Sequence, residues 1–299
     1  MRCGVLAVDK PEGFTSFDVI AKLRGILKER RLGHSGTLDP MATGVLPVFI
    51  GRATKAIDVL PDQKKRYTAH FALGYSTDTQ DVTGEILQRS GKTVTEADIT
   101  AALPEFTGKI SQLPPMYSAV RVNGKRLYDL ARAGIEAERT PREIEVFDFR
   151  LTSFDEASQS GELDICCSKG TYIRTLINDL GERLGTLGVM TALRRTYSQG
   201  FEITHCVTLS QIEEAAKAGR IDELIIPIEN CFDCFPELKL SEKQEKMYKN
   251  GVALDKVRVS GADAEGLYRA YGSGFLGIAG VQSGEVRPHK NFWEAENLQ

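Results

Sequence analysis

Two stretches of the chain carry hydrophobic residues at the three- and four-residue spacing of an amphipathic helix. The first predicts a helix from about Ser16 to Lys28, with apolar positions at Val19, Ile20, Leu23, Ile26 and Leu27. The second predicts a helix with apolar positions at Ile173, Leu176, Ile177, Leu180 and Leu184. Thr95, followed by Asp98, resembles a capping box and predicts a short third helix that ends near Leu103.

Other segments read as strands, with apolar and polar residues alternating most clearly in residues 67–73. Further strands are expected in residues 144–151 and 163–168. Residues 33–47 are punctuated by glycine and proline and are expected to form a loop. Because strands and helices are interspersed without a repeating βαβ rhythm, the sequence favours the α+β class.

The pattern changes near residue 236. A charged helix is expected from Ser241 to Asn250, ended by Gly251, and is followed by short strands at residues 257–259, 267–271 and 275–279. We therefore expect two domains, a larger one in residues 1–235 and a small β-rich one in residues 236–299.

The bulk composition is that of an ordinary globular protein, with 41% hydrophobic and 26% charged residues in 299. No apolar run is long enough to span a membrane and no N-terminal stretch reads as a signal peptide, so we expect a cytoplasmic protein without membrane contact. The six cysteines are too sparse for a disulfide scaffold. The Cys231 and Cys234 pair lacks a second pair of zinc ligands, so all six are expected to be structural thiols and no metal site is expected.

Charge is segregated along the chain although its net value is only −3. Ten Lys or Arg residues face four acids between Lys22 and Arg66, whereas acids dominate between Asp78 and Glu105. Charge alone favours a solvated surface over a nucleic-acid site, but the distribution leaves a basic binding face open.

Three stretches could carry chemistry. The loop around Asp39 holds a carboxylate among small residues, although an Asx turn would explain that aspartate equally well. Arg174 falls in the first turn of the second helix, where either a solvated side chain or a compensating anion is consistent with the helix dipole. Tyr67 follows a basic run at the start of a strand, which fits a core tyrosine or a base-stacking one.

These stretches together resemble the bacterial tRNA pseudouridine-55 synthase family, often called TruB. Residues 9–16 (DKPEGFTS) resemble its first motif, residues 33–44 (GHSGTLDPMATG) its catalytic motif, residues 65–67 (KRY) its tyrosine motif and residues 168–174 (SKGTYIR) its arginine motif. Residues 193–195, 115–119 and 124–128 also match. The resemblance covers roughly residues 4 to 210, with the motifs in family order, and the segment from Leu238 to Trp293 more loosely resembles a PUA-type RNA-binding module.

The resemblance implies a pseudouridine synthase fold with a mixed, mainly antiparallel sheet, and an enzyme that isomerises uridine 55 in the T arm of tRNA. It implies that Asp39 is the nucleophile, that Arg174 pairs with it, and that Tyr67 stacks on the base and helps remove the proton from carbon 5. His34 would fill the space of the flipped base, and Tyr172 and Leu193 would line the pocket. Because isomerisation needs no redox change or group donor, no cofactor is expected. A monomer without an obligatory protein partner is also expected.

Two other classes of protein stay open on the sequence. A non-catalytic RNA-binding protein would not need intact Asp39, Tyr67 and Arg174. A glycoside hydrolase usually needs two carboxylates, and no second acid accompanies Asp39 within the catalytic, tyrosine or arginine motifs. Within the enzyme class, an RNA-guided box H/ACA-type synthase is the rival, which the short C-terminal module and the lack of basic tails disfavour.

Overall fold

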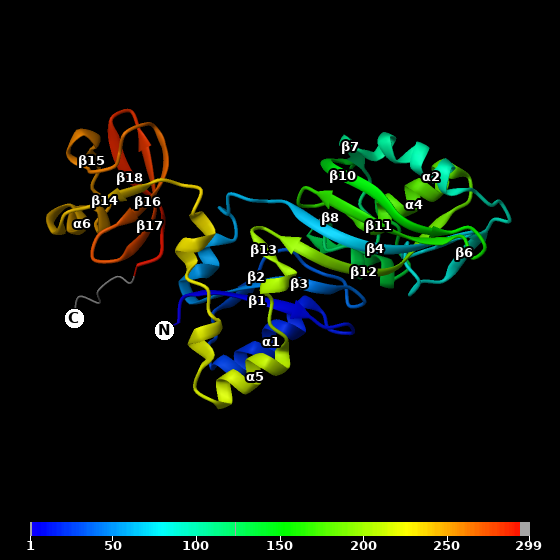
Figure 1. Cartoon of the computed structure of the whole chain (residues 1–299), viewed down its shortest axis with the longest axis horizontal. Helices are drawn as coiled ribbons and strands as arrows, with labels where there is room; N and C mark the ends of the chain where they lie inside the picture. The colour runs from blue at the N-terminus through cyan, green and yellow to red at the C-terminus, as the bar shows by residue number, and fades with distance from the viewer. Residues whose placement is uncertain (1, 123, 294–299) are drawn as a thin grey trace.

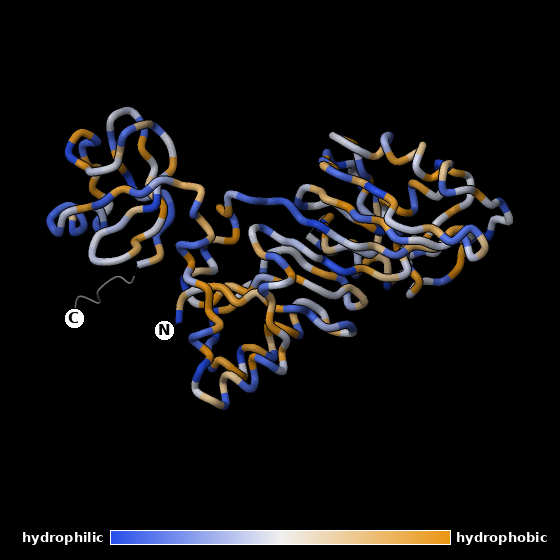
Figure 2. The backbone as a smooth tube through the Cα atoms, viewed as in Figure 1, coloured by the Kyte–Doolittle hydropathy of each residue, from blue (hydrophilic) through white to orange (hydrophobic). Residues whose placement is uncertain are grey.

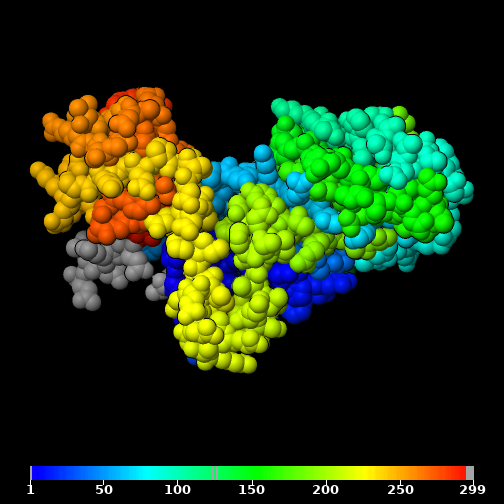
Figure 3. All heavy atoms as spheres, viewed as in Figure 1, coloured from blue at the N-terminus to red at the C-terminus, as the bar shows by residue number. Residues whose placement is uncertain are grey.

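The computed structural model describes residues 2–122 and 124–293 of the chain. The molecule is elongated (Figures 1 and 3), with a small C-terminal β-sheet unit in orange and red at one end. Residues 61–202, in cyan and green, form a lobe at the other end, which we call the central lobe because it comes from the middle of the sequence. An N-terminal lobe (residues 2–60 and 203–235) lies in space between these two parts.

A nine-stranded sheet runs through the N-terminal and central lobes. Its strand order is β1-β3-β12-β4-β11-β10-β7, with β2 paired to β3 and β13 paired to β12. Most pairings are antiparallel, whereas β12 meets β3 in a short parallel contact. The α+β class and the mixed, mainly antiparallel sheet are therefore confirmed. The strands are β1 (Gly4–Lys10), β2 (Leu32–His34), β3 (Thr43–Ile50), β4 (Lys65–Leu73), β7 (Gly108–Gln112), β10 (Arg142–Asp155), β11 (Ser160–Cys167), β12 (Gly188–Ser198) and β13 (Phe201–Glu202).

The three helices expected in these lobes are present. Helix α1 (Ser16–Leu27) begins at Thr15, whose side chain accepts a hydrogen bond from Asp18 N–H in a capping box. Helix α2 (Glu96–Ala102) begins at Thr95 with a capping box of the same kind. Helix α4 (Ile173–Leu184) ends at Gly185, which adopts the left-handed conformation that glycine tolerates. The lobes also contain α3 (Leu127–Arg132), α5 (Leu209–Lys217) and the hairpins β5–β6 (Tyr75–Thr77, Ile86–Arg89) and β8–β9 (Arg121–Val122, Lys125–Arg126).

Two local predictions were wrong. Residues 33–47 are only partly a loop, because β2 includes Gly33 and His34 and β3 begins at Thr43. Seven consecutive pairs with β1 hold β3 in the sheet, including Pro47 opposite Ala7, so tertiary pairing overrides the turn-forming composition. The strand expected at residues 257–259 is instead largely a 3₁₀ turn at Lys256–Arg258, capped by Asp255.

The C-terminal unit has a sheet and a core of its own. Its strands follow the order β14-β16-β17-β18-β15, and its one helix in the described residues is α6 (Glu242–Lys249). A ring contact joins it to the N-terminal lobe, because Phe292 lies 5.9 Å from Phe232, centroid to centroid. The strands are β14 (Glu237–Lys239), β15 (Leu254–Asp255), β16 (Gly266–Tyr271), β17 (Phe275–Gln282) and β18 (Glu285–Asn291).

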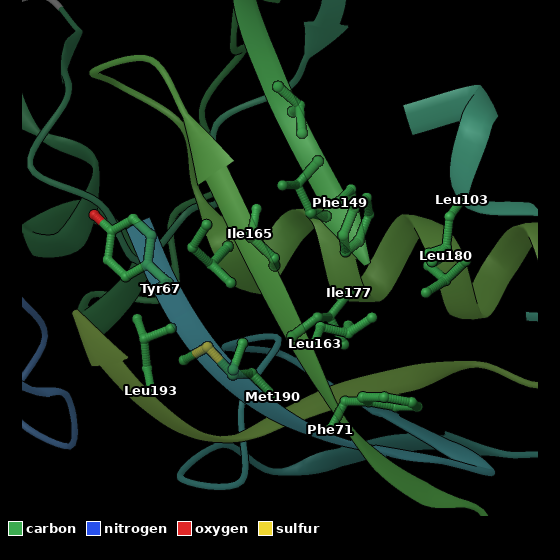
Figure 4. Close-up of a cluster of buried hydrophobic side chains, with 14 of the residues drawn as sticks. Tyr67, Phe71, Leu103, Phe149, Leu163, Ile165, Ile177, Leu180, Met190 and Leu193 are labelled. Carbon is green, nitrogen blue, oxygen red and sulfur yellow. The ribbon is translucent and has the colours of Figure 1, made fainter. Parts of the chain in front are cut away.

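Separate hydrophobic cores stabilise the two lobes. In the N-terminal lobe, α1 and α5 pack against β1 and β3, and apolar segments gather there in Figure 2. In the central lobe, α2 and α4 pack against β4, β10, β11 and β12. Figure 4 shows that second core, with Tyr67 and Leu193 at its edge. Among the residues that the structure describes, no helix has the length and apolar character needed to cross a membrane.

Candidate active site

Asp39 lies in the loop between β2 and β3, and this loop is anchored in the central lobe. Leu38 and Ala42 are buried beside Tyr67 in the central core, although β2 and β3 belong to the N-terminal lobe. The Leu38 N–H donates to Ser16 Oγ at 2.9 Å, and the Ala42 N–H donates to the Asp39 carbonyl at 3.0 Å. The backbone is therefore fixed on both sides of Asp39, while its side chain stays 38% exposed.

The Asp39 carboxylate forms an ion pair with Arg174, whose Nε lies 3.0 Å from Asp39 Oδ2. A carboxylate in an Asx turn would accept from its own backbone instead, so this contact favours the interpretation in which Asp39 faces a partner. Asp39 is therefore the compensating anion that the position of Arg174 in the first turn of α4 suggested.

Arg174 is held from several sides and is only 5% exposed. Its Nη1 donates to the Thr79 carbonyl at 2.8 Å and its Nη2 to the Tyr117 carbonyl at 2.9 Å. These hydrogen bonds occupy the two terminal nitrogens of the guanidinium, and Nε remains to contact Asp39. The planar donor set thus orients the ion pair as well as forming it.

A second carboxylate, Asp81, lies behind this arginine and was not anticipated from the sequence. Its Oδ2 is 3.7 Å from Arg174 Nη1, and its Oδ1 accepts from the Thr79 hydroxyl at 2.7 Å and from the Thr83 N–H at 2.9 Å. Asp81 is 4% exposed and does not line the cavity described next, so it balances the arginine rather than facing a substrate. The cluster of Asp, Thr and Gly in residues 78–84 was its only sequence signal.

A cavity of about 230 Å³ opens beside the ion pair. Tyr67 from β4, Leu193 from β12 and Tyr172 at the start of α4 lie in its wall, together with Asp39 and Arg174. Asp39 is the only acid among the described residues that line it. The remaining lining residues are Thr37, Leu38, Lys65, Ser118, Ala119, Gly170, Thr171 and Ile173.

The two tyrosines in this wall are fixed by different means. Tyr67 is 5% exposed, and burial raises its pKa to about 12, so the phenol is protonated at neutral pH. Tyr172 is pinned through its backbone, because its N–H donates to Gln112 Oε1 at 2.8 Å and its carbonyl accepts from Gln112 Nε2 at 3.0 Å. Gln112 is itself buried at the end of β7.

His34 is the one expected site residue that the structure keeps out of the cavity lining. It ends β2, opposite Val48 of β3. Burial lowers its pKa, and the charges of Arg195 and Lys65 lower it further, so the imidazole is neutral at physiological pH. Its buried Nδ1 has no hydrogen-bond partner within the described part of the chain.

Two buried cations, Lys10 and Arg195, and one half-buried cation, Lys65, also surround the site, and the sequence did not single out their burial. Lys10 is fully buried, and its Nζ donates to the carbonyls of Pro11 at 2.8 Å and Phe14 at 2.5 Å. Burial lowers the pKa of Lys10 to about 8 and has the same effect on Lys65. Arg195 is fully buried in β12. Sequence patterns treat such residues as exposed, so nothing in them marks this burial.

The thiols of Cys166, Cys167, Cys206, Cys231 and Cys234 are free, and Cys167 faces the core whereas its neighbour Cys166 is half-buried, as strand alternation predicts. Burial raises the pKa of Cys231 to about 12, which makes it unreactive. Within residues 2–122 and 124–293, no group of three or more His, Cys, Asp or Glu residues has a metal-binding arrangement.

Comparison with known proteins gives matches along most of the chain. A family model described as TruB family pseudouridylate synthase (N terminal domain) matches residues 24–173. One described as tRNA pseudouridylate synthase B C-terminal domain matches residues 174–233. The chain is 44% identical over 257 residues to tRNA pseudouridine synthase B of Bacillus cytotoxicus, covering 84% of each chain. It is 46% identical over 255 residues to the protein of that name from Lactococcus lactis subsp. lactis, covering 83% of this chain and 78% of the relative.

Solved structures also resemble the chain. A Cbf5-Nop10-Gar1 complex contains a chain with a TM-score of 0.69 and 25% identity, covering 93% of this chain and 78% of that one. An H/ACA RNP bound to a substrate RNA containing 2′-deoxyuridine gives a TM-score of 0.72 at 23% identity, covering 97% and 85%. The second likeness is one of fold alone.

Proposed function

The chain belongs to the TruB family of pseudouridylate synthases, and we propose from this that uridine 55 in the T loop of tRNA is its substrate and Asp39 its nucleophile. As a tRNA pseudouridine synthase, the protein is an isomerase. The observation that carries the residue assignment is the ion pair between Asp39 and Arg174 at the wall of a cavity that also holds Tyr67.

The reaction breaks the bond between N1 of uracil and C1′ of ribose and forms a bond between C5 and C1′. N1 gains a proton and C5 loses one, so no electrons enter or leave and no group donor is required. In this proposal Asp39 attacks the ribose or the base, or assists departure of the uracil. Arg174 stabilises the carboxylate electrostatically and holds it in one orientation, since both ends of its guanidinium are bonded.

The cavity geometry supports stacking by Tyr67 more directly than proton removal by it. The ring forms part of the wall, and Leu193 lies next to it in Figure 4. A phenol with a pKa of about 12 is neutral at rest, so it could accept the C5 proton only if its own proton left in the same step. A base that reaches this cavity must leave the stacked loop, at a cost of roughly a few kcal/mol.

The wider assignments follow from a tRNA substrate. We propose that residues 1–235 form the catalytic domain and that residues 236–299 form a PUA-like domain that adds RNA contacts. A monomer that acts in the cytoplasm without an obligatory protein partner fits this role. Relatives named tRNA pseudouridine synthase B at 44–46% identity favour the stand-alone enzyme over an RNA-guided one.

Position-specific mapping of pseudouridine on unmodified tRNA tests the proposal. The wild-type protein should convert uridine 55 and leave a tRNA with cytidine at that position unmodified. Asp39→Asn should bind the tRNA almost as well but form no pseudouridine, because it removes the nucleophile and little contact surface. Conversion at a different uridine would refute the site assignment, and turnover by Asp39→Asn would refute the mechanism.

A further inference from the structure

Two cationic side chains converge on Gly36, in the loop that precedes Asp39. A methyl group built on Gly36 would lie 2.7 Å from Lys65 Nζ and 3.2 Å from Arg195 Nη1. Lys65 reaches this point from β4 and Arg195 from the neighbouring strand β12. The absence of a side chain at Gly36 therefore lets two positively charged side chains pack against the backbone of this loop.

Neither cation is balanced by an acid among the residues that the structure describes. Within the described part of the chain, Lys65 Nζ makes no hydrogen bond or ion pair and Arg195 makes no ion pair. Arg195 donates from Nε to the Val45 carbonyl at 2.7 Å and from Nη2 to the Gly36 carbonyl at 2.9 Å, but its buried Nη1 has no hydrogen-bond partner among the described residues. Burying a charge without a counter-ion is costly, and burial together with Arg195 lowers the pKa of Lys65 to about 8.

Lys65 lies in the wall of the candidate active site. Lys65 and Tyr67 are two residues apart on β4 and share one face of the sheet, and both line the cavity with Asp39. Asp39 itself is already paired with Arg174. An anion that restored the balance at Lys65 would thus come from outside the protein, next to a base stacked on Tyr67.

We propose that Lys65, with Arg195 behind it, forms a phosphate subsite in the wall of the cavity that binds one of the two phosphodiester groups flanking the flipped uridine. The proposal rests on the proposed function, because the flipped nucleotide supplies the phosphate. Lys65 makes the direct contact, since it lines the cavity, whereas the fully buried Arg195 contributes through its field. The subsite would hold the sugar-phosphate backbone while Tyr67 holds the base, and so fix the ribose between them.

The test removes the positive charge of Lys65 and the negative charge of one RNA phosphate, separately and together. Three T-arm stem-loop RNAs are compared: one with all its phosphates, one with a neutral methylphosphonate on the 5′ side of the target uridine, and one with it on the 3′ side. Dissociation constants are measured at fixed salt for wild type, Lys65→Met and the control Lys64→Met. Lys64 is exposed one residue earlier, over the Phe147 ring at 5.1 Å, so its removal changes the same charge outside the subsite.

Lys65→Met should weaken binding of the all-phosphate RNA by about ten- to hundredfold, the range for a hydrogen bond to a charged group. One of the two methylphosphonates should weaken wild-type binding by a similar factor. On that RNA, Lys65→Met should raise the dissociation constant by less than about a further threefold. Lys64→Met should weaken all three RNAs by one common factor. If Lys65→Met weakened binding by the same factor on each methylphosphonate RNA as on the all-phosphate RNA, the effects would be independent and the proposed subsite would be wrong.

Stability supplies a second readout that separates binding from folding. Lys65→Met removes a half-buried cation that has no acidic partner among the described residues, so its Tm should equal or exceed that of the wild type. A Tm well below wild type would make Lys65 a structural residue and overturn the proposal. Pseudouridine formation by the wild type on the all-phosphate RNA tests the proposed function separately, because the binding cycle can be measured whether or not turnover occurs.

Discussion

Replacement of Asp81 by asparagine should disturb the site without touching the cavity. The substitution keeps the size of the side chain, and the amide oxygen can still accept the bonds that Oδ1 accepts from Thr79 and Thr83. The substitution removes only the negatively charged Oδ2, which lies 3.7 Å from Arg174 Nη1. An amide NH₂ in that place would direct a donor at a donor and leave the guanidinium with Asp39 as its only carboxylate.

The magnitude follows from burial. Removing one partner of a buried ion pair costs about 3–5 kcal/mol, and the remaining pair with Asp39 at 3.0 Å reduces this, so we expect a loss of about 2–3 kcal/mol in the free energy of unfolding. A shift of Arg174 by about 1 Å would slow the reaction by about 10²-fold. Urea unfolding and single-turnover pseudouridine formation at saturating enzyme measure the two effects.

Asp78→Asn is the matched control, because Asp78 lies on the same turn but pairs elsewhere. Its Oδ1 accepts from the Glu85 N–H at 2.8 Å and its Oδ2 from the Tyr117 hydroxyl at 3.0 Å. We expect this variant to lose about 1 kcal/mol and to keep a rate close to wild type. If Asp81→Asn unfolded and reacted like Asp78→Asn, the assigned role of Asp81 in holding Arg174 would be wrong.

Two further predictions concern RNA binding. The dissociation constant for tRNA should rise steeply with salt despite the net charge of −3, because basic segments face the phosphates; a flat dependence in a salt titration would contradict this. Deletion of residues 238–299 should raise the dissociation constant more than it slows single-turnover chemistry, and it should lower the Tm because Phe232 loses its contact with Phe292. A folded truncation that bound tRNA normally but had lost chemistry would place catalytic groups in the C-terminal unit.

The sequence predicted those elements whose signals are local. Thr15 and Thr95 marked helix starts because a cap acts within one turn, and the apolar spacing of α1 and α4 reports a single buried face. Strand β3 was missed because its stability comes from pairing with β1, which lies more than thirty residues earlier. The local amino-acid composition of a segment does not indicate pairing with a strand so far away in the sequence.

The site shows the same division. Asp39 and Arg174 could be named from motifs, and the structure places them 3.0 Å apart. Asp81 and Arg195 could not be predicted as buried groups, because a charged residue is expected at the surface and only the fold decides otherwise. His34 stood in a recognised motif; it ends β2 and does not line the cavity, and its expected role in filling the space of the flipped base stays a prediction.

The placement of Leu38 and Ala42 in the central core has a consequence for how activity is acquired during folding. The loop that carries Asp39 is synthesised early with the N-terminal lobe, whereas the core that receives these two residues is completed only by α4 and β12. Contacts between such distant parts of a chain form late, since loop closure must precede them. A chain with all its helices and strands formed but its lobes undocked would therefore contain every motif residue and have no active site.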